Sequence, residues 1–458
     1  MAGKTARGKS ASANRRVHIV LVPGFAGFDA LGQLEYYAGV TPQFRGWKDP
    51  FVPGRPNVVL HYFDNFPTAA VATRATRLRD YLVKRIARGE FLPGDSLALI
   101  GHSTAGLDIR RLIYALDDDL RQNAGTQYPV DGTGGTPFTV SADELLGMVK
   151  RIVFLSVPQF GTNIADWVHT YTIGRQVVVA KLRASVEVSQ IPLLDSFEEC
   201  VSNFAAKATD LDLLEAVQDS LAEAESSCSA DRMQVALAQE AASELALWLR
   251  HMATDFSALD DLTADTHGDT ISPAHFDHET RQQEIKVWKS RGIQTKSYAS
   301  IGLRPFDFDP DQPAPRWDLL NPFSCLDTCC NSPRRSKADI VYRACYRACA
   351  GGPFRYPHID NLPLPPVLVD ETGKRRTIAV WDNDGIVNTA SMLWPNGRET
   401  VLINADHMDM VGHFRRVTTP DSASGRKYQS YDLLQSGSDF HLNKFAQMWE
   451  RIFDFCVS

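Results

Sequence analysis

Ser103 lies in a short turn whose residue types suit nucleophilic catalysis. The turn GHSTAG, residues 101–106, joins a strand-like apolar run at 96–100 to an amphipathic, helix-like stretch at 107–116. Small residues beside the serine permit the tight strand-to-helix turn that exposes a nucleophile, and Ala105 stands where a second glycine is usual. This setting favours a catalytic serine over a serine that only caps the following helix.

A serine hydroxyl needs a base to accept its proton, and the base needs a carboxylate that orients it. Two later segments supply these residue types in the chain order serine, acid, histidine. A strand-like run at 377–381 is followed by Asp382 and Asp384, and another at 400–404 is followed by His407. Aspartates also favour turns, and a single histidine is as readily a surface residue. Taken together with the serine, the order makes a catalytic triad the better explanation.

Backbone amides near the serine would be needed to stabilise a tetrahedral intermediate. One donor is expected to be the amide of Thr104, directly after the nucleophile. The second is expected from the loop VPGFAG at 22–27, where glycines allow a close backbone approach and the Phe25 amide is best placed. Without the triad, a simple strand-ending turn would explain this loop equally well.

The composition is that of an ordinary globular chain. It has 458 residues, of which 44% are hydrophobic and 22% charged, and a formal net charge of −7. The negative charge argues against nucleic acid as a partner, and no apolar run reaches the roughly 18 residues that span a bilayer. Residues 1–16 are small, polar and basic, so we expect a disordered tail and not a signal peptide. The chain is expected in the cytoplasm or, if a signal was removed, secreted or periplasmic.

Strand-like and helix-like segments alternate, which predicts a mostly parallel sheet flanked by helices. Strands are expected at 17–22, 57–62, 96–100, 151–157, 295–301, 377–381 and 400–404, and helices at 70–86, at 107–116, after Ser141 and at 442–455. The stretch 117–140, rich in Gly, Thr and Asp, is expected to be a surface loop. Together with the turn at Ser103, these elements predict the α/β-hydrolase fold.

Two insertions interrupt the predicted core. The block 163–258 is rich in alanine, leucine and glutamate and carries no strand signal, so it is expected to be a helical subdomain. The block 305–374 holds many prolines and most of the cysteines. The hydrolase core is therefore assigned to 17–162, 259–304 and 375–458.

Several segments resemble the bacterial lipases of the thermophilic bacillus and staphylococcal group. They are VPGF at 22–25, the turn at 100–106, PQFGT at 158–162, and NDGIVNTASM at 383–392 followed by DHMD at 406–409. The last pair is the most specific match, and it selects Asp384 over Asp382 as the acid and His407 as the base. The resemblance implies a lipase-like enzyme.

The resemblance also implies a lid and a metal site. In that group a helical insertion covers an apolar acyl pocket, which makes 163–258 a candidate lid; a plain structural subdomain is the alternative. Some members bind calcium through a carboxylate two residues after the catalytic histidine. Asp409 has that position here, although Phe414 stands near the place of the later aspartate. Zinc is not expected, because His61 and Asp64 are the only nearby donors.

Four cysteines form two C-x-x-x-C pairs, Cys325 with Cys329 and Cys345 with Cys349. On helices this spacing puts both thiols of a pair on one face, and a helix is expected after Ser336. The arrangement resembles a twin C-x-x-x-C staple, which would join Cys325 to Cys349 and Cys329 to Cys345. A four-thiolate zinc site and reduced, partly buried thiols remain as alternatives.

These features together predict a carboxylic ester hydrolase that forms an acyl-enzyme on Ser103 and requires no cofactor for its chemistry. Its substrates are expected to be esters with an apolar acyl part, such as lipids or polyesters, because the resemblance is to lipases. Acyl transfer to an alcohol would use the same triad. A binding protein built on a degenerate hydrolase scaffold is the alternative from another class.

Overall fold

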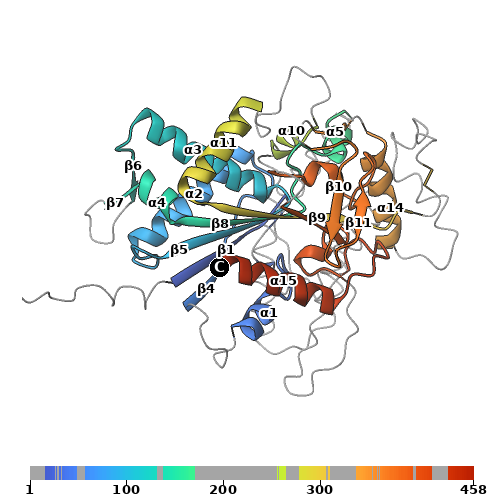
Figure 1. Ribbon diagram of the computed structural model, residues 1–458, viewed down its shortest axis with the longest axis horizontal. Helices are drawn as coiled ribbons and strands as arrows, with labels where there is room; N and C mark the ends of the chain where they lie inside the picture. Colours follow the sequence, from blue (N-terminus) through green and yellow to red (C-terminus); the bar gives the residue numbers. More distant parts are fainter. Residues whose placement is uncertain are drawn as a thin grey trace, which may run out of the picture.

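An eight-stranded sheet forms the centre of the protein (Figure 1). The computed structural model describes residues 16–25, 27, 30–31, 34–48, 57–130, 138–170, 255, 257–264, 278–305, 308–309, 337–352, 354–357, 359, 362–395, 399–414 and 432–458. The sheet has the order β11-β10-β12-β9-β8-β5-β1-β4. Its strands are β1 Arg16–Val22, β4 Asn57–Tyr62, β5 Ser96–His102, β8 Val149–Leu155, β9 Gln294–Ile301, β10 Val367–Asp370, β11 Arg375–Thr377 and β12 Thr400–Asn404. All neighbours pair in parallel except β10 and β11, which are antiparallel.

Helices cover both faces of the sheet (Figure 1). One face carries α2 Val71–Ala87, α3 Ala105–Gln122, α4 Ala142–Met148 and α11 His278–Arg291, and the other carries α1 Val40–Trp47 and α15 Leu442–Val457. Alternation along β1 produces this division, because Val20 and Val22 join the first apolar cluster while Ile19 and Leu21 join the second. A mostly parallel sheet between two helical layers, with a strand-to-helix turn after central β5, is the α/β-hydrolase fold.

Shorter elements complete the described chain. They are the helices α5 Asn163–Thr170, α10 Ala258–Asp261 and α14 Lys337–Ala350, the 3₁₀ turns η1 Thr389–Met392 and η2 Asp409–Val411, and the strand pairs β2 Ala30–Leu31 with β3 Leu34–Glu35 and β6 Gln127–Val130 with β7 Phe138–Ser141. The expected helix after Ser141 is confirmed: the Ser141 hydroxyl accepts a hydrogen bond from the Glu144 amide at 3.0 Å. The helix expected after Ser336 corresponds to α14.

Two expectations about local structure were wrong. The strand expected at 377–381 ends at Thr377, because the Ile378 amide turns to the carbonyl of Pro366 and the Asp382 carboxylate accepts from the amide of Ala379. The loop expected at 117–140 contains the end of α3 and both strands of the β6–β7 pair. Side-chain pairing explains the longer helix, since Arg121 bonds to Asp117 one turn earlier at 2.9 Å.

Other expectations fall outside the described residues. These include the tail before Arg16, where β1 begins, most of the block 163–258, and the first half of the block 305–374. No helix in the described part of the chain combines the length and the apolarity that a membrane span needs.

Two histidines meet on the neighbouring strands β1 and β4. Nδ1 of His18, on β1, lies 2.9 Å from Nε2 of His61, on β4. Nε2 of His18 lies 3.0 Å from the carboxylate of Asp95. Arg16 completes the network by a 2.8 Å bond to Asp95. Burial lowers the pKa of His18, and burial together with the neighbouring His18 lowers the pKa of His61 to about 4. The folded protein therefore keeps this pair neutral.

The histidine pair predicts a loss of stability in mild acid. The unfolded chain takes up protons near pH 6.5, whereas folded His61 does so only near pH 4. The unfolded state thus binds more protons in this window, so stability is full above pH 6.5 and falls as the pH drops towards 4. Thermal melts at pH 7.5 and 5 should show a smaller loss of Tm for His61→Gln than for the wild type. Equal losses would contradict this prediction.

Candidate active site

The sequence around Ser103 folds into a strained turn between β5 and α3. Ser103 has φ = +56°, a left-handed backbone conformation that non-glycine residues rarely adopt. A β-carbon on Gly101 would lie 2.8 Å from the backbone of the first turn of α3, and one on Gly106 would overlap Val157. Ala105, which replaces the usual second glycine, is fully buried in the apolar core, so its methyl group is accommodated.

His407 and Asp384 are brought together by the loops after β12 and β11. Nδ1 of His407 lies 2.8 Å from Oδ2 of Asp384, and the carboxylate is fully buried. A carboxylate accepts hydrogen bonds, so Nδ1 carries the proton and Nε2 of the neutral ring is left to act as an acceptor. The Asp384 carbonyl also accepts from the His407 amide at 3.1 Å. The pair has the geometry of a base and its orienting acid.

Asp382, the other candidate acid, has a different role. Its carboxylate accepts a hydrogen bond from the Ala379 amide at 2.8 Å and lies 3.9 Å from the guanidinium of Arg376. It therefore stabilises the turn after β11, which is the turn chemistry expected of aspartate. The ring of His407 is bonded to Asp384 and not to this residue.

Three further donors hold the Asp384 carboxylate. Oδ1 accepts from the amides of Ile386 at 3.0 Å and Val387 at 2.7 Å. Oδ2 accepts from the hydroxyl of Ser300, on β9, at 2.5 Å. The Ser300 hydroxyl in turn lies 2.6 Å from that of Ser156, a second buried serine with positive φ. Sequence reasoning missed both serines, because neither lies in a motif.

The turn that carries Ser103 is hydrogen-bonded to the loop that carries His407. Nε2 of His102 lies 2.9 Å from the His407 carbonyl oxygen, and Nδ1 lies 2.6 Å from the Tyr36 hydroxyl. A carbonyl cannot donate, so Nε2 carries the proton and Tyr36 donates to Nδ1. Burial lowers the pKa of His102 well below its usual value, which keeps this ring neutral. His102 belongs to the turn GHSTAG, but no sequence signal pointed to Tyr36.

The loop after β1 passes directly against Ser103. A β-carbon on Gly24 would lie 2.7 Å from Ser103 Cβ, from the His102 carbonyl oxygen and from the Tyr36 hydroxyl, so only glycine fits. Phe25, a predicted oxyanion donor, follows in this loop. Thr104, the other predicted donor, precedes the first residue of α3, where backbone amides have no acceptor within the helix.

Helix α14 supports the loop that carries Asp384. The side-chain amides of Asn383 and Asn388 donate to the carbonyls of Tyr346 and Cys349 in its last turn, both at 3.1 Å. A β-carbon on Gly385 would lie 3.0 Å from the ring of Tyr342 on the same helix. The cysteine-rich insertion therefore positions the candidate acid.

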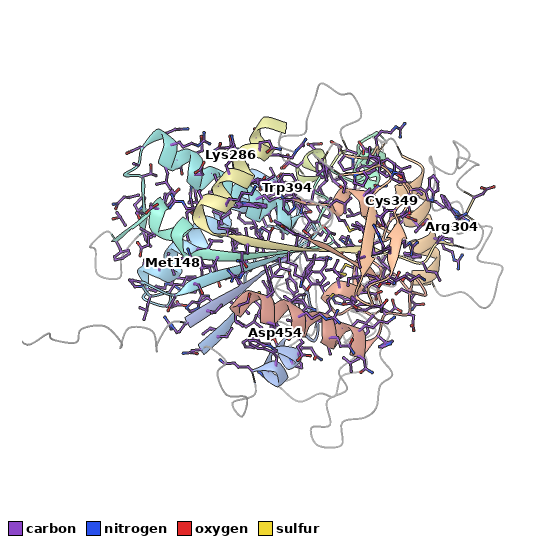
Figure 2. The ribbon with its side chains drawn as sticks, in the orientation of Figure 1. Met148, Lys286, Arg304, Cys349, Trp394 and Asp454 are labelled. Carbon is purple, nitrogen blue, oxygen red and sulfur yellow. The ribbon has the colours of Figure 1, made fainter. Side chains whose placement is uncertain are left out.

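Only two of the four cysteines in the expected staple lie among the described residues. Cys345 and Cys349 are free thiols on α14, and Figure 2 labels Cys349 on the side of the molecule that carries α14 and β10. Burial raises the pKa of Cys345 to about 11. The structure thus does not show the disulfides expected of Cys345 and Cys349. Cys325 and Cys329 lie outside the described residues, and the staple stays a prediction.

An acidic cluster lies beside the candidate base. Asp406, Asp409 and Asp432 each place one carboxylate oxygen within 4.8 Å of the others, and they line a cavity of about 450 Å³. Burial raises the pKa of Asp406 to about 7 and that of Asp409 well above its usual range. Calcium prefers such oxygen donors, so the donor set fits the ion. The sequence pointed to Asp409 alone, because Asp432 is distant along the chain. Phe414, by contrast, is buried in the core.

His61 and Asp64, the nearest candidate donors for zinc, have other contacts. His61 bonds to His18, as described above, and Asp64 lies 3.5 Å from the guanidinium of Arg77.

Comparison with known proteins gives neighbours in structure only. No family model matches the chain, and no curated protein matches it. A metagenomic carboxyl esterase, MGS0156, is similar at 13% identity over 99% of this chain and 80% of its own, with a TM-score of 0.34. Lipase 1 from Pelosinus fermentans is 14% identical over 96% and 98%, with a TM-score of 0.38. The Bacillus licheniformis lipase BlEst2 is 10% identical over 89% and 91%, with a TM-score of 0.36. Membership of the thermophilic bacillus and staphylococcal group stays a prediction.

The hydrogen bond from Ser300 to Asp384 predicts a measurable effect on the reactivity of Ser103. A fluorophosphonate should label Ser103, and Ser300→Ala should slow this labelling about tenfold, because a hydrogen bond to a charged group contributes roughly 1.5–3 kcal/mol. Intact-mass kinetics would give the rates. Ser297→Ala is the matched control, since Ser297 is also buried on β9 but donates to the Trp394 carbonyl. Equal rates for both variants would remove Ser300 from the site.

Proposed function

We propose that the protein is a serine carboxylic ester hydrolase with Ser103 as nucleophile, His407 as base and Asp384 as orienting acid. One observation carries the proposal: the His407–Asp384 pair is hydrogen-bonded, through His102, to the strained turn that presents Ser103. A paired histidine beside a serine in a strand-to-helix turn is the arrangement that activates a hydroxyl for acyl transfer.

The proposed reaction proceeds in two halves. His407 Nε2 takes the proton of Ser103 as its Oγ attacks the ester carbonyl, and the resulting oxyanion is held by the amides of Phe25 and Thr104. The intermediate collapses to an acyl-enzyme as the ester C–O bond breaks and His407 gives the proton to the leaving alcohol. His407 next deprotonates a water that attacks the acyl group. The acid leaves, and Ser103 regains its proton.

The apolar side chains near these groups favour an apolar acyl part. Each of the three loops carries one apolar side chain that is only partly buried. These are Phe25 in the proposed oxyanion loop, Ile386 in the loop of the acid and Met408 in the loop of the base. Lipids or polyesters with such acyl groups are therefore the proposed substrates. The block 163–258 is the proposed lid, and its first residue, Asn163, is tied to the acid loop through Asn388 at 3.2 Å.

The first test is hydrolysis of p-nitrophenyl esters of increasing chain length. The wild type should hydrolyse them and Ser103→Ala should lose at least a thousandfold in kcat/KM, because removal of the nucleophile leaves only binding and the oxyanion site. Ser141→Ala, which removes a helix cap, is the control and should change stability by about 1 kcal/mol without changing kcat.

Two results would overturn this proposal. A wild type that fails on every ester would exclude ester hydrolysis, and acyl transfer to an added alcohol without release of free acid would favour an acyltransferase.

Calcium is the proposed structural ion, held by Asp406, Asp409 and Asp432. An ion bound there would connect the loop of the base to the segment that begins at 432, because both would supply carboxylate ligands. Saturating calcium should raise the Tm by a few degrees, since a ligand at a hundred times its Kd stabilises by about 2.7 kcal/mol, and EDTA should reverse the shift. Asp432→Asn should abolish the response, whereas Asp439→Asn, an exposed neighbour, should retain it. An unchanged Tm with calcium would contradict the site.

A further inference from the structure

Arg74, on α2, is fully buried and holds the loop that precedes the proposed oxyanion amide. Its Nη2 donates to the carbonyls of Pro23 at 2.7 Å and Gly24 at 3.1 Å. Its Nε bonds to the Asp108 carboxylate at 2.9 Å, and its Nη1 bonds to the carbonyls of Phe66 and Pro67. The guanidinium thus joins α2, α3 and the loop after β1 at one point.

The geometry of the peptide bond gives this contact a direction. In a planar trans peptide the C=O of one residue and the N–H of the next point in opposite directions. Arg74 binds the Gly24 carbonyl, so the N–H of Phe25 in the same peptide is turned away from Arg74. A β-carbon on Gly24 would overlap Ser103, so this peptide lies close to the serine. The Gly24 carbonyl also accepts from the Gly27 amide at 3.0 Å, which closes the turn.

We infer that Arg74 is a positioning residue for the oxyanion site: it fixes the peptide between Gly24 and Phe25 and strengthens the Phe25 amide as a donor. This inference rests on the proposed ester hydrolysis. A carbonyl that accepts a charge-assisted hydrogen bond polarises its own peptide, so the N–H becomes a better donor.

Lysine could not take this role. The planar guanidinium places donors along three edges, one for Asp108 and two for the carbonyls. An ammonium group would retain the charge beside Asp108 but has no fixed fork with which to hold two loops together.

A purely structural role is the competing explanation, because a buried ion pair also stabilises the packing of helices. The chain offers a matched control in Arg110, on α3. It is equally buried, bonds to Glu284 at 2.9 and 2.8 Å, and lies over the ring of Trp394, which Figure 2 labels. Its Nη1 donates to the side chain of Gln159 at 2.8 Å.

The experiment compares Arg74→Lys and Arg110→Lys with the wild type on one p-nitrophenyl ester, with Tm measured in parallel. Arg74→Lys should lower kcat 10- to 100-fold and change KM less than threefold, since positioning acts mainly in the transition state. Arg110→Lys should lose a comparable Tm and keep kcat within threefold. Added guanidinium at millimolar concentration should restore at least a tenth of the lost kcat in Arg74→Ala and none in Arg110→Ala.

Each outcome separates this inference from the proposed function. If the wild type is active, Ser103→Ala is inactive and Arg74→Lys keeps kcat within threefold, the inference fails and ester hydrolysis stands. If the wild type hydrolyses no ester, both fail. Should Arg74→Lys not fold, the double variant Arg74→Met with Asp108→Asn replaces it under the same criteria, because it removes the donor to the Gly24 carbonyl without leaving the Asp108 charge unpaired.

Discussion

A carboxylate fully removed from water must have its charge met by hydrogen-bond donors, and Asp384 is such a group. Its four donors come from its own loop, from β9 and from the candidate base. The requirement explains why α14 packs against this loop and why asparagines beside the acid bind the end of that helix. Helix α14, within the second insertion, therefore supports the loop that carries this charge.

The same principle operates on the other side of Ser103. Arg74 and Asp108 are both buried and pair with each other, and Arg74 also donates to backbone carbonyls. His102 is kept neutral by burial and links two loops through opposite nitrogens. The turn at Ser103 is strained, and these contacts on either side hold it in place. Preorganisation of this kind is what catalysis by transition-state stabilisation requires.

Local patterns were sufficient to predict most of the sheet. β4 and β12 have the expected bounds because apolar runs between turn residues identify strands. The candidate residues Ser103, Asp384 and His407 could be named because the turn at Ser103 and the chain order are local signals. Ser300, Tyr36 and Arg74 could not, since their bonds to the site span 84, 66 and 50 residues. Such contacts exist only after the sheet has formed, and no spacing along the chain encodes them.

The strand ends themselves form a ladder across the site. The amide of Ser103 donates to the carbonyl of Leu155 at the end of β8, and the amide of Ser156 donates to that of Tyr298 on β9. The Gly302 amide after β9 then donates to the Asn383 carbonyl beside the acid. The relative heights of Ser103 and Asp384 are thus fixed by the main chain. A designer who wished to graft this site onto another parallel sheet would have to transfer three adjacent strand ends in register, and not only three side chains.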